Sequence, residues 1–193
     1  SLYKKRFPKN IDVYFVNTLE ENELEREVSK FKNYKMIIGF GGGQALDIAK
    51  YFSWKCNLKL FQFPTSISVD AVFGHRSGIR RDGNVNYIGW AIPECVFLDY
   101  EIIQSAPKIY NYSGIGDVLC FYTGVLDWQY ANKQNKCEEK WLYNQELANK
   151  SLGYVEDLLL NVENIKEMNE EGINAIINAH QWGGNSFYSS GWN

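Results

Sequence analysis

The sequence has little of what marks membrane, nucleic-acid-binding and disulfide-stapled proteins. No apolar run approaches the roughly 20 residues that cross a bilayer, so we expect no membrane span. The 20 basic side chains do not outnumber the 23 acidic ones, so nucleic acid is not an expected partner. The four cysteines form no Cys-x-x-Cys pair and no cluster with histidine. They predict reduced thiols in a cytoplasmic protein rather than a zinc or disulfide framework.

The composition is that of a folded globular protein. The chain is 45% hydrophobic and 22% charged, with only 4 prolines, which excludes a disordered tail and a collagen-like rod. Its 193 residues correspond to one ordinary domain or two small ones, at about 100–150 residues each. We therefore expect a sizeable buried core.

The first half of the sequence alternates between short apolar runs and helical patterns. β-Branched and aromatic runs predict strands, whereas apolar residues three and four positions apart predict helices. The alternation predicts an α/β fold with a parallel, Rossmann-like sheet whose ligands bind at the carboxyl ends of the strands. Strands are expected at 11–16, 35–40, 58–63 and 95–98, and helices at 19–31 and around 45–52.

The remainder of the chain predicts one hairpin and then helices alone. Asp82-Gly83 lies between two short extended segments, which predicts a β-hairpin over 77–88. Strand patterns end after Pro107, and helical patterns continue to the end of the chain. One helix face is predicted to carry Trp141, Ala148, Leu152, Val155 and Leu159.

A run of three glycines follows the second expected strand. Gly41, Gly42 and Gly43 leave backbone N–H groups unobstructed at the start of a helix, where the helix dipole favours an anion such as a pyrophosphate. The run differs from the usual dinucleotide fingerprint because Gln44 stands where the last glycine is expected. The alternative is a tight turn that lets the helix pack close to the sheet.

The third expected strand ends in a polar segment. Thr65, Ser66, Ser68 and Asp70 place three hydroxyls and a carboxylate near the carboxyl edge of the sheet. Such groups can hold a nucleotide, although a plain hydroxyl-capped turn is an alternative.

An aspartate marks the start of the helical half. Gly114 to Asp117 is expected to open a helix, where Asp117 could be an N-cap or first-turn acid. A metal ligand is the other reading, and the local sequence leaves both open.

Three motifs occur in a fixed order along the chain. They are Gly41-Gly42-Gly43 with Asp47 and Lys50, Pro64-Thr65 with Asp70, and Ala106-Pro107 with Gly116-Asp117. Together they resemble the motifs of the iron-containing alcohol dehydrogenase group, which has the dehydroquinate synthase-like fold. Within that group, Thr123 and Asp127-Trp128 look most like the glycerol-1-phosphate dehydrogenase branch, with glycerol dehydrogenase next.

The resemblance implies an NAD- or NADP-linked dehydrogenase of a polyol or polyol phosphate. A divalent metal, usually Zn²⁺, would lie between a nucleotide-binding α/β domain, here 1–104, and a helical metal-binding domain, here 105–193. The family is also expected to be cytoplasmic and homo-oligomeric. By residue match, Asp70 would orient the substrate and Asp117 would be a catalytic metal ligand. The cofactor would contact Gly41, Gly42, Gly43, Asp47, Thr65, Ser66 and Ser68.

The match fails at two points. The family's metal site takes two histidines beyond a segment like Ser190-Gly191, whereas this chain has only His75 and His180. We expect His75 in a surface loop and His180 at a helix end. Family members also carry a strand and helix before the segment that resembles 11–16. We therefore expect an internal fragment, incomplete at both ends.

Two other functions stay open. A dehydroquinate synthase-like lyase would also use NAD and zinc, with Arg76, Arg80 and Arg81 as candidates to bind a phosphate. These arginines equally suit a phosphorylated polyol or a solvated hairpin. A non-enzymatic fragment would keep the nucleotide site without the chemistry.

Overall fold

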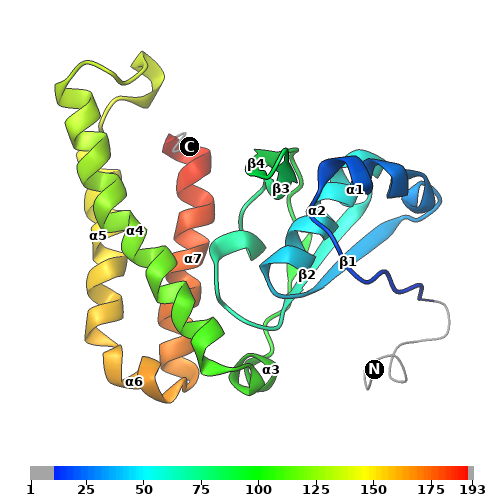
Figure 1. Ribbon diagram of the computed structural model, residues 1–193. Coiled ribbons are helices and arrows are strands. Elements are labelled where there is room, and N and C mark those ends of the chain that lie inside the picture. The colour runs from blue at the N-terminus through cyan, green and yellow to red at the C-terminus, as the bar shows by residue number, and fades with distance from the viewer. Residues whose placement is uncertain (1–10, 191–193) are drawn as a thin grey trace.

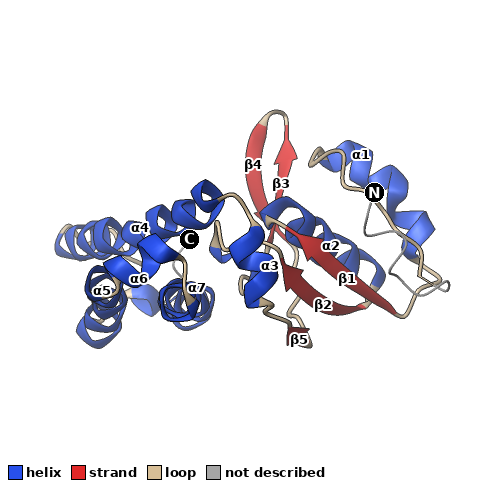
Figure 2. Ribbon diagram, turned by 90° about the horizontal axis from the view of Figure 1, so that it is seen from below, coloured by secondary structure: helices blue, strands red, loops and turns tan. Residues whose placement is uncertain are grey.

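The computed structural model describes residues 11–190, with side chains described to residue 184. A sheet region and a helical region lie side by side, and α3 (Tyr100–Ser105) lies between them (Figures 1 and 2). In the described part of the chain, no helix is long and apolar enough to span a bilayer.

The sheet is parallel, as predicted. It consists of β1 (Met36–Gly41), β2 (Lys59–Pro64) and β5 (Cys95–Val96) in the order β1-β2-β5. The strand expected at 95–98 is only two residues long, because Leu98 turns away to pack against the core of the helical region.

The strand expected at 11–16 does not form, and this prediction is wrong. The segment instead contacts the first helices. The ring centroid of Tyr14 lies 5.4 Å from that of Phe31 and 5.6 Å from that of Phe52, both in edge-on contacts. Most side chains of this segment stay exposed, and Val16 alone is partly buried, against the neighbouring core, so a β-branched run alone does not fix a strand.

Helix α2 (Gly43–Cys56) covers one face of the sheet. Its buried side includes Leu46 and Ala49, and a Cβ on Gly39 of β1 would lie 2.9 Å from the Cβ of Ala49. That position must therefore be glycine for the helix to approach the strand.

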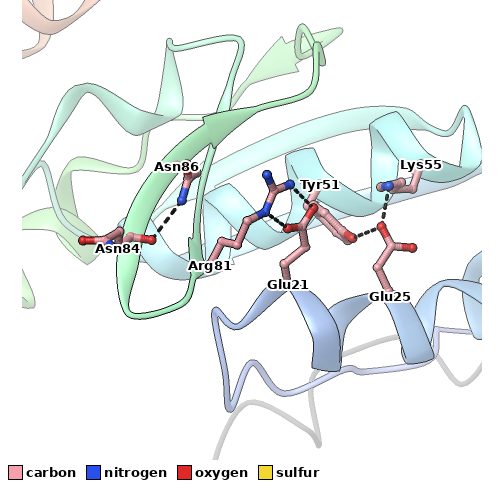
Figure 3. Close-up of polar contacts among 7 residues, drawn as sticks. All are labelled: Glu21, Glu25, Tyr51, Lys55, Arg81, Asn84 and Asn86. Atoms are coloured by element: carbon pink, nitrogen blue, oxygen red, sulfur yellow. Dashed lines mark hydrogen bonds and ion pairs between the residues drawn. The ribbon is translucent and has the colours of Figure 1, made fainter.

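Polar contacts attach α1 (Glu21–Glu27), which continues as η1 (Val28–Phe31), to α2 and to the hairpin (Figure 3). Glu21 accepts two hydrogen bonds from the Arg81 guanidinium, at 2.5 and 2.9 Å. Glu25 accepts from the Tyr51 hydroxyl at 2.7 Å and pairs with Lys55.

The predicted hairpin is present. Strands β3 (Ser77–Arg81) and β4 (Asn84–Ile88) pair antiparallel, and Asp82 and Gly83 both have positive φ, at 52° and 77°. Two consecutive residues with positive φ are what a two-residue hairpin turn requires. The loop between β2 and β3 contains η2 (Asp70–Val72).

The second half is helical, as predicted, but two of its details differ. Trp141 was predicted to share a helix face with Ala148, but it lies in a separate 3-10 turn before that helix. Leu159 is 66% exposed, because Ser151 and Leu158 share the buried face with Ala148 and Val155. Gly114–Asp117 does not open a helix, since α4 begins six residues before Gly114. After α3, the elements are α4 (Lys108–Lys133), η3 (Glu139–Trp141), α5 (Gln145–Leu160), α6 (Val162–Glu167) and α7 (Glu170–Ser190).

The two regions meet where the β2–β3 loop touches α4. A Cβ on Gly114 would lie 2.0 Å from the carbonyl oxygen of Ile67, so only glycine allows this approach. Asn111 is fully buried beside it, accepting from the Ile67 N–H at 3.1 Å and donating to the Ile103 carbonyl at 2.8 Å. Ile67 and Ile103 both belong to the core of the helical region. The predicted domain boundary after residue 104 falls inside α3. That division into domains stays a prediction.

Candidate active site between the sheet and the helices

The glycine turn joins the carboxyl end of β1 to the N-terminus of α2. Gly42 is the N-cap of α2, and no side chain caps the first helical N–H groups. Gly41 has φ of 147°, and a Cβ on Gly43 would lie 3.0 Å from Val69 Cγ2. The turn thus requires glycine for packing and also presents backbone donors at the positive end of a helix dipole, where an anion is favoured.

The hydroxyl-bearing segment lies next to this turn, as predicted. The Thr65 N–H donates to the Gly41 carbonyl at 3.0 Å, which joins the ends of the two strands. A Cβ on Gly42 would come within 3.6 Å of Ser66 Oγ, so the bare glycine backbone and the serine hydroxyl border the same space. Ser68 lies further along, where its carbonyl accepts from Ser113 of α4 at 3.4 Å.

Asp70 and Asp117 meet across the two regions. The backbone N–H of Asp70 donates to Asp117 Oδ2 at 2.9 Å. Asp117 lies within α4, so it is neither an N-cap nor a first-turn residue, and that alternative is wrong. Burial, together with the nearby Asp117 carboxylate, raises the pKa of Asp70 to about 7, while the Lys50 ammonium opposes this shift.

His180 approaches the same carboxylate from α7. Its Nε2 lies 3.2 Å from the Gly114 carbonyl and 3.7 Å from Asp117 Oδ2. The side chain is 1% exposed and lies within the helix, so the prediction of a helix-end histidine is wrong. Burial lowers the pKa of His180, and Asp117 opposes the shift. The spacing of Ile173, Ile176, Ile177 and His180 on one helix face was the signal that it is buried.

The described residues contain no group of three histidine, cysteine, aspartate or glutamate side chains that could hold a metal ion. Asp117 is the predicted ligand; it accepts from the backbone N–H of Asp70, and His180 Nε2 lies beside it and the Gly114 carbonyl. Gly191, part of the segment that the resemblance places before the histidine ligands, lies outside the described residues.

Asp47 and Lys50 lie on the inner side of α2 and bond within the protein. Lys50 Nζ lies 2.8 Å from Asp47 Oδ1, and the Gly78 N–H also donates to the Asp47 carboxylate. Burial raises the pKa of Asp47, although both of these partners oppose the shift. The prediction that Asp47 contacts the cofactor stays a prediction.

His75 is not a surface residue, which corrects the prediction. It is 8% exposed, and its ring packs on Trp90 with the centroids 4.1 Å apart. Burial, aided by Arg76 and Lys50, lowers the pKa of the imidazole. Of the three arginines near the hairpin, Arg81 pairs with Glu21, while Arg76 and Arg80 are exposed.

The sequence was compared with known families and proteins. The family described as iron-containing alcohol dehydrogenase matches residues 5–107. The chain belongs to this family. Among curated relatives, the glycerol-1-phosphate dehydrogenase [NAD(P)+] of Pyrococcus horikoshii is 31% identical over 180 residues, covering 91% of this chain and 51% of the relative. That of Sulfolobus acidocaldarius is 33% identical over 139 residues, covering 68% and 40%.

Solved structures of the family share the fold. A probable glycerol dehydrogenase from Sinorhizobium meliloti matches with a TM-score of 0.76 at 18% identity, covering 97% of this chain and 56% of that one. Glycerol dehydrogenase from Schizosaccharomyces pombe matches with a TM-score of 0.70 at 22% identity, covering 92% and 47%. The predicted fold class, a Rossmann-like sheet followed by helices, is confirmed, and the chain spans about half the length of its curated relatives.

Proposed function

We propose that this chain forms the cofactor- and substrate-facing part of a metal-dependent, NAD(P)-linked dehydrogenase of polyols or polyol phosphates. The observation that carries the proposal is the contact between Asp70 and Asp117, which places a carboxylate of the helical region beside the β2–β3 loop, whose first residues border the glycine turn. The names of the curated relatives make glycerol-1-phosphate the first substrate to test.

The glycine turn fits the diphosphate of a dinucleotide. A Cβ on Gly42 would fill the space toward Ser66, and no side chain occupies the N-cap donors of α2. In the proposed complex, backbone N–H groups of Gly41, Gly42 and Gly43 bind the diphosphate. Thr65, Ser66 and Ser68 then contact the adjoining ribose and nicotinamide portions. A bound nicotinamide cofactor supplies the hydride acceptor.

The metal site is only partly present in the described residues. Asp117 offers one hard oxygen ligand, which suits a divalent cation, with Zn²⁺ as the first candidate. Such an ion would lower the pKa of a bound substrate hydroxyl. Because the described residues form no full ligand set, we derive no reaction step through the metal.

Asp70 is proposed to orient the substrate. With a pKa of about 7, its carboxyl group is partly protonated near neutral pH. It can therefore donate a hydrogen bond to a polyol hydroxyl or accept one from it. Assembly into a homo-oligomer and a cytoplasmic location are part of the proposal and rest on the resemblance alone.

The test is an assay of the full-length protein with NAD or NADP, added Zn²⁺ and either glycerol-1-phosphate or glycerol, followed by the absorbance of the reduced nicotinamide. Turnover that is lost in Asp117→Asn supports the proposal. Nucleotide binding without turnover of any polyol would favour an inactive binding fragment. Phosphate release from a sugar-acid phosphate without net reduction of NAD would favour the lyase.

A further inference from the structure

The ammonium group of Lys50 is buried and fully bonded, yet the proposed function gives it no role. The side chain is 2% exposed, and lysine is rarely buried unless it is paired. Its three N–H donors have three acceptors, namely Asp47 Oδ1 at 2.8 Å, the Ala71 carbonyl at 2.8 Å and the Arg76 carbonyl at 2.5 Å. Burying a charge carries a desolvation cost, so this arrangement calls for an explanation beyond simple stability.

The two carbonyls lie near the two ends of the segment that leads from Asp70 to β3. Ala71 is in η2, and Arg76 directly precedes β3. Within this segment, the N–H groups of Phe73 and Gly74 both donate to the Asp70 carbonyl, at 2.8 and 3.1 Å. Lys50 therefore holds both ends of a short irregular segment that contains no strand.

The same side of α2 links this segment to the glycine turn. Gly43, Asp47 and Lys50 stand at positions i, i+4 and i+7, which places them on one face of a helix. At the start of that face, a Cβ on Gly43 would lie 3.0 Å from Val69 Cγ2 and 3.9 Å from the Cβ of Ala71. The helix whose N-terminus forms the proposed anion site thus contacts the Asp70 segment (residues 69–76) at two levels.

We propose that Lys50, held in place by Asp47, is a positioning residue that fixes the Asp70 segment against α2. The link keeps the substrate-orienting carboxylate at a constant spacing from the nucleotide-binding turn. The identity of the two ligands rests on the proposed function, whereas the mechanical link does not.

The test compares two pairs of charges with the same i, i+3 spacing. Lys50→Met alone leaves the Asp47 carboxylate buried without its cation, and the resulting loss of stability would confound the test. Asp47→Asn/Lys50→Met removes both charges together while the two carbonyls still lose their donor. The matched control is Glu27→Gln/Lys30→Met, a surface pair whose lysine side chain is 65% exposed.

The first measurement is amide hydrogen exchange of the full-length protein without ligands. In Asp47→Asn/Lys50→Met, we expect the amides of residues 66–76 to exchange about tenfold faster, while the exchange rates of α5 and α7 stay at their wild-type values. The surface control should leave both regions unchanged. Unchanged exchange at 66–76, or an equal rise over the whole protein, overturns the proposal, because the pair would then be dispensable or merely stabilising.

The second measurement is steady-state kinetics. Displacement of Asp70 should lower kcat by about tenfold to a hundredfold. The glycine turn itself is intact in this variant, so a KM for the nucleotide within about threefold of the wild-type value supports positioning. A larger rise in this KM would assign Asp47 to the cofactor, as the resemblance implies, and would count against the proposal. A rise in the KM for the nucleotide by the same factor as the fall in kcat would contradict a positioning role. Failure of the wild-type protein to bind a nucleotide would defeat the proposed function while leaving the exchange result interpretable.

Discussion

The two sides of the candidate site are built from different kinds of groups. On the sheet side, the proposed ligand-binding groups are backbone N–H groups and short hydroxyls in turns, set by glycines and by the ends of two strands. On the helical side, Asp117 and His180 project from the interiors of two long helices. The sheet side is therefore determined mainly by local sequence, and the helical side by long-range packing. Substitutions on the two sides should therefore differ in their effects on stability and on ligand binding.

The largest expected effect is at the junction between the two sides. Gly114→Ala places a Cβ 2.0 Å from the Ile67 carbonyl oxygen, and neither backbone can move without separating the regions. We expect a loss of about 3 kcal/mol or more in the free energy of unfolding, measured by urea denaturation.

The control for this variant lies two residues further along the same helix. A Cβ on Gly116 meets nothing within 4 Å, so Gly116→Ala should stabilise the protein by up to about 1 kcal/mol through helix propensity. Equal effects of the two variants would show that the junction is not a close contact.

The next effect concerns Asp70 and pH. Its pKa is raised to about 7 from 3.8, so the folded state holds a proton that the unfolded state releases between these values. This group's contribution to stability therefore falls by roughly 4 kcal/mol as pH rises from about 4 to 7, and then levels off. Asp70→Asn should lose this dependence in urea unfolding between pH 5 and pH 8. A variant that keeps the wild-type slope would contradict the shifted pKa.

A smaller effect on stability, but a specific one on binding, is expected at the glycine turn. Gly42 has φ of −80°, and an added Cβ comes no closer than 3.6 Å to Ser66 Oγ, so Gly42→Ala should fold normally. The methyl group would nevertheless project into the proposed diphosphate space. We expect NAD(P) binding to weaken about tenfold or more by isothermal titration calorimetry, which corresponds to about 1.4 kcal/mol.

The reference for this variant is Gly153→Ala in α5, where an added Cβ meets nothing within 4 Å. It should leave nucleotide binding unchanged. If Gly42→Ala binds as tightly as this reference, the turn does not hold the diphosphate.

The same contrast explains which features could be predicted from the sequence. The hairpin at Asp82-Gly83 and the glycine turn at Gly41 contain residues with positive φ, a conformation that few residues other than glycine adopt, so short motifs identified them. The start of α4 was misplaced because Gly114 resembles a helix boundary, whereas the glycine is there for a contact with Ile67. A contact between residues 47 positions apart leaves no local signal.

Two other features were missed for related reasons. The segment 11–16 has the composition of a strand, but it does not pair with β1, and Tyr14 instead contacts Phe31 and Phe52. Lys50 was recognised only as part of a motif, since nothing in its neighbourhood predicts that Ala71 and Arg76 will supply its acceptors. The local sequence around Lys50 therefore does not predict that its charge is buried.

The bond between Asp70 and Asp117 uses the main chain of one residue and the side chain of the other. Any amino acid except proline at position 70 would retain the donor, because only proline lacks the N–H. Assembly and chemistry are therefore separable at this position. Evolution or design could exchange the side chain to suit another substrate without dismantling the interface that presents it.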